Sequence, residues 1–169
     1  NGTEILLHEE YFKTIELIGQ NYLLTNGLSL YKNDNLMKRL KQIGIEHIDM
    51  SYHFGIHEEI SNINYQIICD NIQRLLDYGI RTTINSYNYK LIPKIIEQAY
   101  FMAAEGIKFT NFMKIGEANN MNLDNILTDE QIKIFFKLLH LERKKYNIKD
   151  FRIRRCGSFG EDVNYNVNK

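Results

Sequence analysis

The sequence predicts an α/β protein in which helices and strands alternate around a parallel sheet. Apolar residues recur at helical spacing in five segments, and a short apolar or β-branched run follows each of them. Glycines stand between several of these pairs, where helices commonly end. Strands joined by helices are expected to run parallel, because a helical crossover returns the chain to the same edge of the sheet.

Five helices are predicted, each with an apolar stripe, over residues 11–18, 34–43, 58–77, 93–104 and 128–146. Asp34 is the expected N-cap of the second helix, and Thr128 with Gln131 forms a capping-box pattern for the fifth. Pro93 suits the first turn of the fourth helix. The expected helix ends are Gly19, Gly44, Gly79 and Gly106.

Five short strands are predicted over residues 21–25, 45–51, 80–85, 107–115 and 150–155. They are mostly apolar, as expected of strands in a sheet that is covered on both faces. Because the pattern opens on a helix, we expect either an open flavodoxin-like sheet or a partial (βα) TIM-like barrel that lacks its first units. We expect residues 1–155 to form this partial barrel and residues 156–169 to form a C-terminal loop and tail.

The composition is that of an ordinary globular domain. Of the 169 residues, 44% are hydrophobic and 25% are charged. The formal net charge of zero implies no broad attraction to nucleic acid or to an anionic membrane. No apolar run is long enough to span a bilayer. Two cysteines are too few for a disulfide framework, so we expect a reducing cytoplasm.

Polar clusters follow the predicted strands, at the ends that converge on one edge of a parallel sheet. They are Thr25-Asn26-Gly27, Ser51-Tyr52-His53, Asn85-Ser86, Lys114 to Glu117 and Arg155-Cys156. Uncharged hydrogen-bonding groups dominate, and these suit a ligand with hydroxyls, amides and a zwitterion. The sequence has no GxxxxGK[ST] or GxGxxG phosphate loop and no GxSxG nucleophile turn.

Several of these residues also have a purely structural interpretation. Asn26-Gly27 is a common turn, and Cys69 lies in an apolar helical stripe typical of a core. His53 and His57 stand four residues apart, but the sequence has no HExxH pattern, so we predict no zinc site there. The arginines that alternate around Ile153 fit a solvated strand edge as well as a binding patch.

The polar segments, in their order and spacing, resemble the radical S-adenosylmethionine (SAM) superfamily. Residues 2–8 (GTEILLH) resemble the GGEPLLH stretch of that family, and Leu24 to Gly27 resembles its TNG turn. Residues 48–51 (IDMS) and 112–118 (FMKIGEA) resemble two later strands of the same fold. The resemblance covers residues 2–120. The family's CxxxCxxC loop is absent, and its second glycine and its proline are replaced by Thr3 and Ile5.

The resemblance implies that SAM and a four-iron–four-sulfur cluster are the cofactors, with the cluster ligands expected before residue 1. The residues it places on SAM are Gly2, Thr3, Glu4, Asn26, Ser51, Asn85, Ile115 and Gly116. The side chains expected to face a substrate are Tyr52, His53, Tyr87, Lys114, Glu117 and Arg155. Cys156 resembles the first cysteine of the auxiliary-cluster extension in SPASM-type members, although one cysteine cannot hold such a cluster.

The implied function is that of part of a radical SAM enzyme, which generates a deoxyadenosyl radical for hydrogen abstraction from a peptide or a small molecule. This stretch alone is expected to be inactive, and exposed apolar edges could cause it to self-associate. Two alternatives stay open. The chain could be a non-catalytic α/β domain that binds a small molecule or a partner. It could also be a peptide-recognition module that pairs an extended peptide with an edge strand.

Overall fold

The computed structural model describes residues 6, 8–54, 64–74, 76–113, 125–146, 151–156 and 159. Within these residues the protein is an α/β fold with a five-stranded parallel sheet, as the sequence predicted. The strands are β1 (Tyr22–Thr25), β2 (His47–Ser51), β3 (Asp77–Ile84), β4 (Gly106–Asn111) and β5 (Arg152–Arg155). The α-helices are α1 (Glu9–Ile18), α2 (Asp34–Gln42), α4 (Tyr65–Gln73), α5 (Ile92–Phe101) and α6 (Asp129–Lys145).

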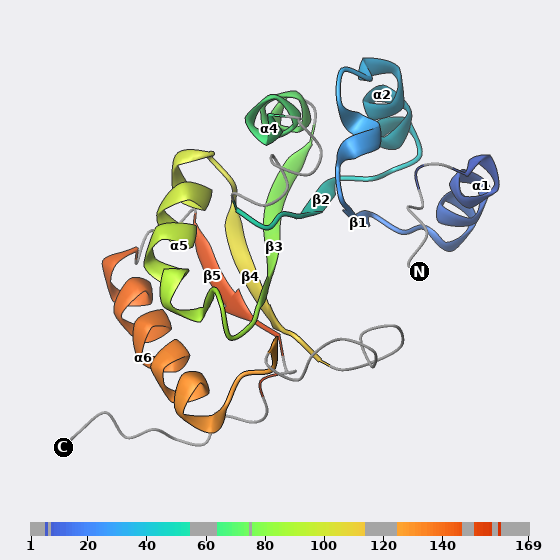
Figure 1. Ribbon diagram of the computed structural model, residues 1–169. Helices are drawn as coiled ribbons and strands as arrows, with labels where there is room; N and C mark the ends of the chain where they lie inside the picture. The colour runs from blue at the N-terminus through green and yellow to red at the C-terminus, as the bar shows by residue number, and fades with distance from the viewer. Residues whose placement is uncertain are drawn as a thin grey trace.

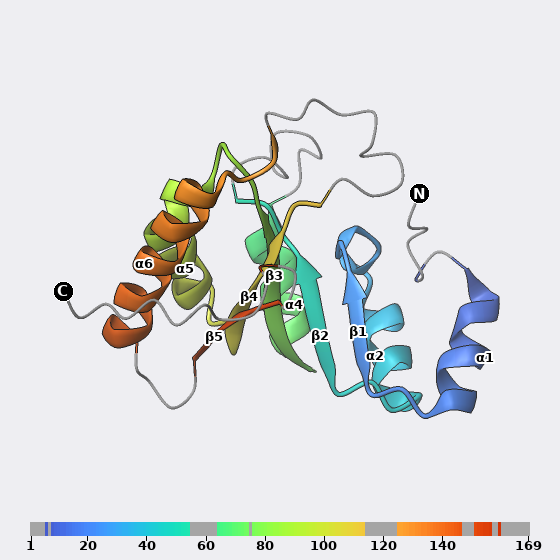
Figure 2. The same cartoon turned by 90° about the horizontal axis from the view of Figure 1, so that it is seen from below.

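The strands lie side by side in the same order as in the sequence, β1-β2-β3-β4-β5. A flavodoxin-like sheet would instead have the order 2-1-3-4-5, so that alternative does not describe these strands. Consecutive units of a (βα) barrel have the observed order. Figure 1 and Figure 2 show α2, α4, α5 and α6 on one face of the sheet, with α1 beside the β1 edge.

The two faces of the sheet differ because successive strand residues point to opposite sides. The face toward the helices is apolar, and Ile48, Met50, Ile80 and Phe109 are fully buried there. The opposite face, which we call the open face, carries polar residues such as His47, Asp49 and Arg81. The expectation of a sheet covered on both faces by apolar packing is therefore wrong for the described residues.

Local sequence explains most helix ends. Gly19 has φ 61° and supplies the left-handed residue after α1, and Thr128 with Gln131 forms the predicted capping box of α6. Asn33, rather than Asp34, caps α2, because its side chain accepts the Leu36 N–H at 3.1 Å. Asp34 is instead the first helical residue, where its charge still complements the helix dipole.

Two of the predicted helix ends are wrong. Gly79 lies inside β3 and Gly106 begins β4, whereas the helices before them end at Gln73 and Phe101. Close packing disfavours a side chain at both positions, most strongly at Gly106, where the neighbouring atom belongs to the backbone. A Cβ on Gly79 would lie 2.7 Å from Asp49 Oδ1, and a Cβ on Gly106 would lie 2.3 Å from the Arg152 carbonyl oxygen. Among the described residues, no helix is long and apolar enough to cross a membrane.

Candidate functional site

Three of the predicted cofactor residues lie at the same edge of the sheet. Asn26 directly follows β1, Ser51 ends β2 and Asn85 directly follows β3. These strands are adjacent, with Thr25 paired to Met50 and Ser51 paired to Arg81. In this register Asn26 is level with Ser51, whereas Asn85 lies four residues beyond Arg81, the partner of Ser51. The three polar side chains therefore share the carboxyl edge of the sheet, with Asn26 and Ser51 on neighbouring positions and Asn85 further along.

Two of these groups also shape their own loops. The Asn26 Oδ1 accepts the Leu28 N–H at 2.9 Å, which stabilises the turn after β1. The Asn85 Oδ1 accepts the N–H groups of Tyr87 (2.9 Å) and Asn88 (3.2 Å). These contacts hold both side chains in place, because each amide bonds the backbone two or three residues further on. The structural interpretation of Asn26-Gly27 as a turn is thus confirmed, and it is compatible with ligand contact.

A cavity of about 410 Å³ opens beside this edge. It lies between Thr82 on the helix-covered face of β3, the residues that follow β2 and β3, and one side of α5, and its lining includes His53, Asn85 and Tyr87. The Tyr87 side chain is 70% exposed. Three residues predicted for cofactor or substrate contact are thus brought together around one cavity, which has the size of a small-molecule site.

Other predicted residues lie elsewhere. The Tyr52 ring is only 5% exposed and stacks on Tyr65 of α4 at a centroid distance of 4.8 Å, so it packs in the core instead of facing a substrate. The Arg155 guanidinium lies 5.2 Å from the Phe136 ring centroid. The half-buried Cys156 donates its backbone N–H to the Phe109 carbonyl, and Cys69 is fully buried, as predicted.

The remaining predicted site residues lie outside the described part of the chain. They are Gly2, Thr3, Glu4, Lys114, Ile115, Gly116 and Glu117. Their assignments stay predictions.

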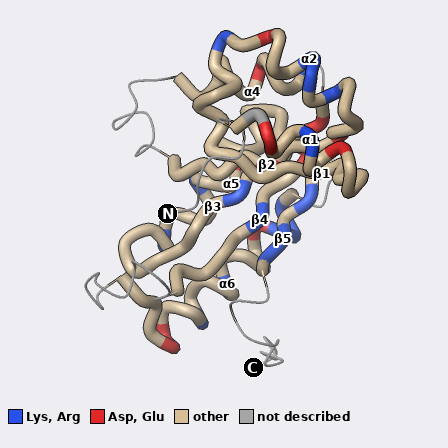
Figure 3. The backbone as a smooth tube through the Cα atoms, turned by 90° about the vertical axis from the view of Figure 1, so that its right-hand side faces the viewer, with Lys and Arg blue, Asp and Glu red and all other residues tan. Residues whose placement is uncertain are grey.

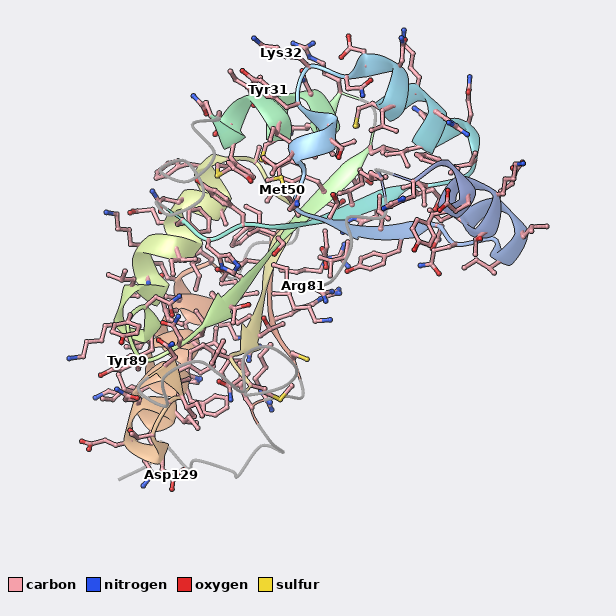
Figure 4. The ribbon with its side chains drawn as sticks, turned by 45° about the vertical axis from the view of Figure 1, so that its right-hand side comes forward. Tyr31, Lys32, Met50, Arg81, Tyr89 and Asp129 are labelled. Atoms are coloured by element: carbon pink, nitrogen blue, oxygen red, sulfur yellow. The ribbon has the colours of Figure 1, made fainter. Side chains whose placement is uncertain are left out.

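The structure adds a polar cluster that the sequence analysis did not identify, on the open face nearer the amino ends of the strands. Asp49 is its centre: Oδ2 accepts the Tyr22 hydroxyl at 2.5 Å and Arg81 Nη2 at 3.0 Å. Oδ1 lies 3.2 Å from His47 Nε2. Glu105 Oε2 lies 3.3 Å from the other nitrogen of the same imidazole. Figure 4 shows Arg81 on the side of the sheet away from Tyr31 and Lys32.

The cluster changes the ionisation of its members. Burial would raise the pKa of Asp49, but hydrogen bonds from His47, Tyr22 and Arg81 outweigh it and lower that pKa well below its usual range. Burial and the bond to Asp49 raise the pKa of Tyr22 to about 12. The bond to Asp49 also raises the pKa of His47, against a smaller opposing effect of burial. The carboxylate is therefore ionised throughout the neutral range and favours the imidazolium.

This cluster predicts a pH-dependent stability. The folded pKa of His47 lies above the ordinary value of 6.5, so the protonated ring stabilises the fold fully below about pH 6.5. That contribution is lost as pH rises through the folded pKa. We expect the free energy of unfolding, measured by urea titration, to fall with pH above 6.5. The variant His47→Gln should flatten the fall, and the matched variant His140→Gln, on the exposed side of α6, should not.

The sequence contains a signal for this cluster, because polar residues alternate with apolar residues within the strands. His47, Asp49 and Ser51 occupy every second position of β2, and Gly79, Arg81 and Thr83 do so in β3. Polar residues at a period of two mark a face that is not packed against helices. The period of two within β2 and β3 is thus the sequence signal that predicts this polar face.

The described residues contain no group of three or more histidine, cysteine, aspartate or glutamate side chains that could hold a metal ion. The fold and the two polar sites define an α/β protein with a parallel sheet, one apolar face and one polar face. In comparisons with known proteins, no family model and no curated protein matches the chain.

Proposed function

We propose that this chain is the SAM-binding part of a radical SAM enzyme, with SAM held at the carboxyl edge of the sheet. The observation that carries the proposal is that Asn26, Ser51 and Asn85 all lie at the carboxyl ends of adjacent parallel strands, with Asn26 level with Ser51. The sequence resemblance assigns these three positions to the cofactor independently of the structure. The order β1 to β5, with helices on one face, is also the order that a (βα) barrel requires.

The chemistry of the donor set fits this ligand. SAM presents ribose hydroxyls, an ammonium and a carboxylate, all of which hydrogen-bond to hydroxyl and amide groups. Ser51 is half-buried and lies on the open face, two residues beyond Asp49. Thr83 and Thr110 lie on the same face, with their hydroxyl oxygens 3.2 Å apart. The Asn85 loop is held by its own hydrogen bonds, so these groups are preorganised.

The chemistry that SAM and a reduced iron–sulfur cluster supply together is hydrogen abstraction from a substrate. In this proposal the residues of the chain orient SAM and exclude water around it. The substrate is a peptide or a small molecule that enters beside His53 and Tyr87, which line the neighbouring cavity. Neither Cys69 nor Cys156 forms a disulfide, and the proposal keeps the reducing cytoplasm expected from the low cysteine count.

The test is SAM binding by isothermal titration calorimetry, combined with amide chemical-shift mapping. We expect saturable binding and shifts centred on Asn26, Ser51 and Asn85. The variant Ser51→Ala should weaken binding about fivefold, because one net hydrogen bond contributes about 1 kcal/mol. The control Thr14→Ala removes a hydroxyl whose hydrogen bond is to Glu10, within α1, and should bind like the parent.

Two results would count against the proposal. One is an absence of saturable SAM binding, which would favour the non-catalytic binding domain or the peptide-recognition module. The other is binding that Ser51→Ala leaves unchanged while the shifted amides lie away from the carboxyl edge. Either result would leave the fold description intact, because it rests on strand order alone.

A further inference from the structure

The open face carries a row of three cations on three adjacent strands. The register pairs Arg81 of β3 with Lys108 of β4, and Lys108 with Arg154 of β5. Neighbouring strands lie about 4.8 Å apart, so the three side chains leave the sheet close together on one face. Arg152 lies two residues before Arg154 and shares its face. Figure 3 shows the basic positions of β3, β4 and β5 near one another.

Only part of this charge is neutralised within the protein. Arg81 is paired with Asp49 at 3.0 Å, and Arg152 lies 3.8 Å from Glu105. None of the residues that the structure describes forms an ion pair with Lys108 or Arg154. Like charges directly opposite each other on adjacent strands are destabilising. Lys108 and Arg154 are therefore two cations of the row without an ion-pair partner among the described residues, and their mutual repulsion would be relieved by a bound anion.

Space for a ligand exists directly over this row. A cavity of about 390 Å³ is lined by all four cations and also by Tyr22, His47, Asp49 and Glu105. Its floor includes Gly79 and Gly106, two positions where a Cβ would collide with neighbouring atoms. Because these two positions carry no side chain, the open face of the sheet is recessed there. The four cationic side chains lie around this recess. The hydrogen bonds among Tyr22, Asp49 and Arg81 form one side of it.

We propose that Lys108 and Arg154, with Arg81 and Arg152, form a binding site for a small dianionic oxyanion, a phosphate ester or a dicarboxylate. Lys108 and Arg154, which have no ion-pair partner among the described residues, can balance a ligand of charge −2. The guanidinium groups can donate paired N–H groups to phosphate or carboxylate oxygens, and Lys108 adds a point charge. The Arg81 Nε is buried and, within the described residues, has no hydrogen-bond partner. This site is separate from the proposed SAM contacts and does not depend on them.

The experiment titrates the chain with inorganic phosphate and, separately, with succinate, at low and at high ionic strength. Calorimetry should show saturable binding that weakens as salt is added, since the site is charged and partly open. Lys108→Gln and Arg154→Gln should each weaken binding at least fivefold, and the double variant at least twentyfold. The matched control Lys38→Gln, on the exposed side of α2, should bind like the parent.

The two ligands identify the source of the oxyanion. Tighter binding of inorganic phosphate assigns the site to phosphate esters, and tighter binding of succinate assigns it to dicarboxylates. Urea unfolding without ligand supplies a second readout, because Lys108→Gln relieves repulsion and should be at least as stable as the parent. The proposal is overturned if neither anion binds saturably, or if Lys38→Gln loses as much affinity as Lys108→Gln.

Discussion

Replacing Asp49 with alanine should lower the free energy of unfolding by about 3 kcal/mol, because a buried charge pair loses one partner. The Asp49 side chain is 12% exposed and the Arg81 side chain is 24% exposed, so water replaces the lost carboxylate only in part. The same change removes the acceptor of the Tyr22 hydroxyl and the partner of the His47 imidazole. Urea denaturation monitored by circular dichroism measures the effect.

A control on the same face isolates the contribution of the cluster. Asp77 begins β3 opposite His47, but it is exposed. Asp77→Ala should therefore change the free energy of unfolding by about 0.5 kcal/mol or less, as is usual for surface substitutions. If Asp49→Ala also cost less than about 1 kcal/mol, the cluster would not be the stabilising centre of the open face. The pKa of Tyr22, raised to about 12 in the folded protein, should also fall in the Asp49 variant.

Replacing Phe135 with alanine should be more damaging still, by about 3 to 5 kcal/mol. The ring is fully buried on the apolar face, where it meets Phe109 of β4 edge-on at 5.8 Å and stacks on Phe159 at 4.4 Å. Truncation of Phe135 leaves a cavity between α6, the sheet and Phe159. Thermal and urea unfolding should both shift, with the melting temperature falling by several degrees.

The comparison for this prediction is Leu141→Ala on the same helix. Leu141 is 52% exposed, so its truncation opens no enclosed cavity, and alanine has a high helix propensity. We expect a change within about 0.5 kcal/mol. Equal effects of the two truncations would mean that α6 packs on the sheet through a different face from the one described.

Much of the fold could be predicted from the sequence because its signals are local. The apolar stripe and capping box of α6 and the left-handed Gly19 after α1 depend on residues a few positions apart. The alternation of helices and strands then favours parallel pairing, since each helical crossover returns the chain to the same end of the sheet before the next strand begins. The carboxyl-edge positions of Asn26, Ser51 and Asn85 follow from the same reasoning, because parallel strands end at one edge.

The wrong predictions concern residues whose positions depend on contacts between segments far apart in the sequence. Gly79 and Gly106 read as helix ends, because glycine after a helical pattern is the usual local signal. Their actual role is to make room for Asp49 Oδ1 and for the Arg152 carbonyl, which lie far away in the sequence. Tyr52 was expected to face a substrate, but the alternation of the strand turns it toward Tyr65. None of these contacts can be inferred from neighbours in the chain.

By itself the sequence determined the α/β class, the parallel direction of the strands and the polar residues at their carboxyl ends, since helical periodicity and capping act over a few residues. Only the tertiary structure decided the strand order, the division into an apolar and a polar face, and the meeting of Tyr22, His47, Asp49 and Arg81. The physical reason is that strand register, which no local propensity encodes, selects which side chains from separate strands become neighbours.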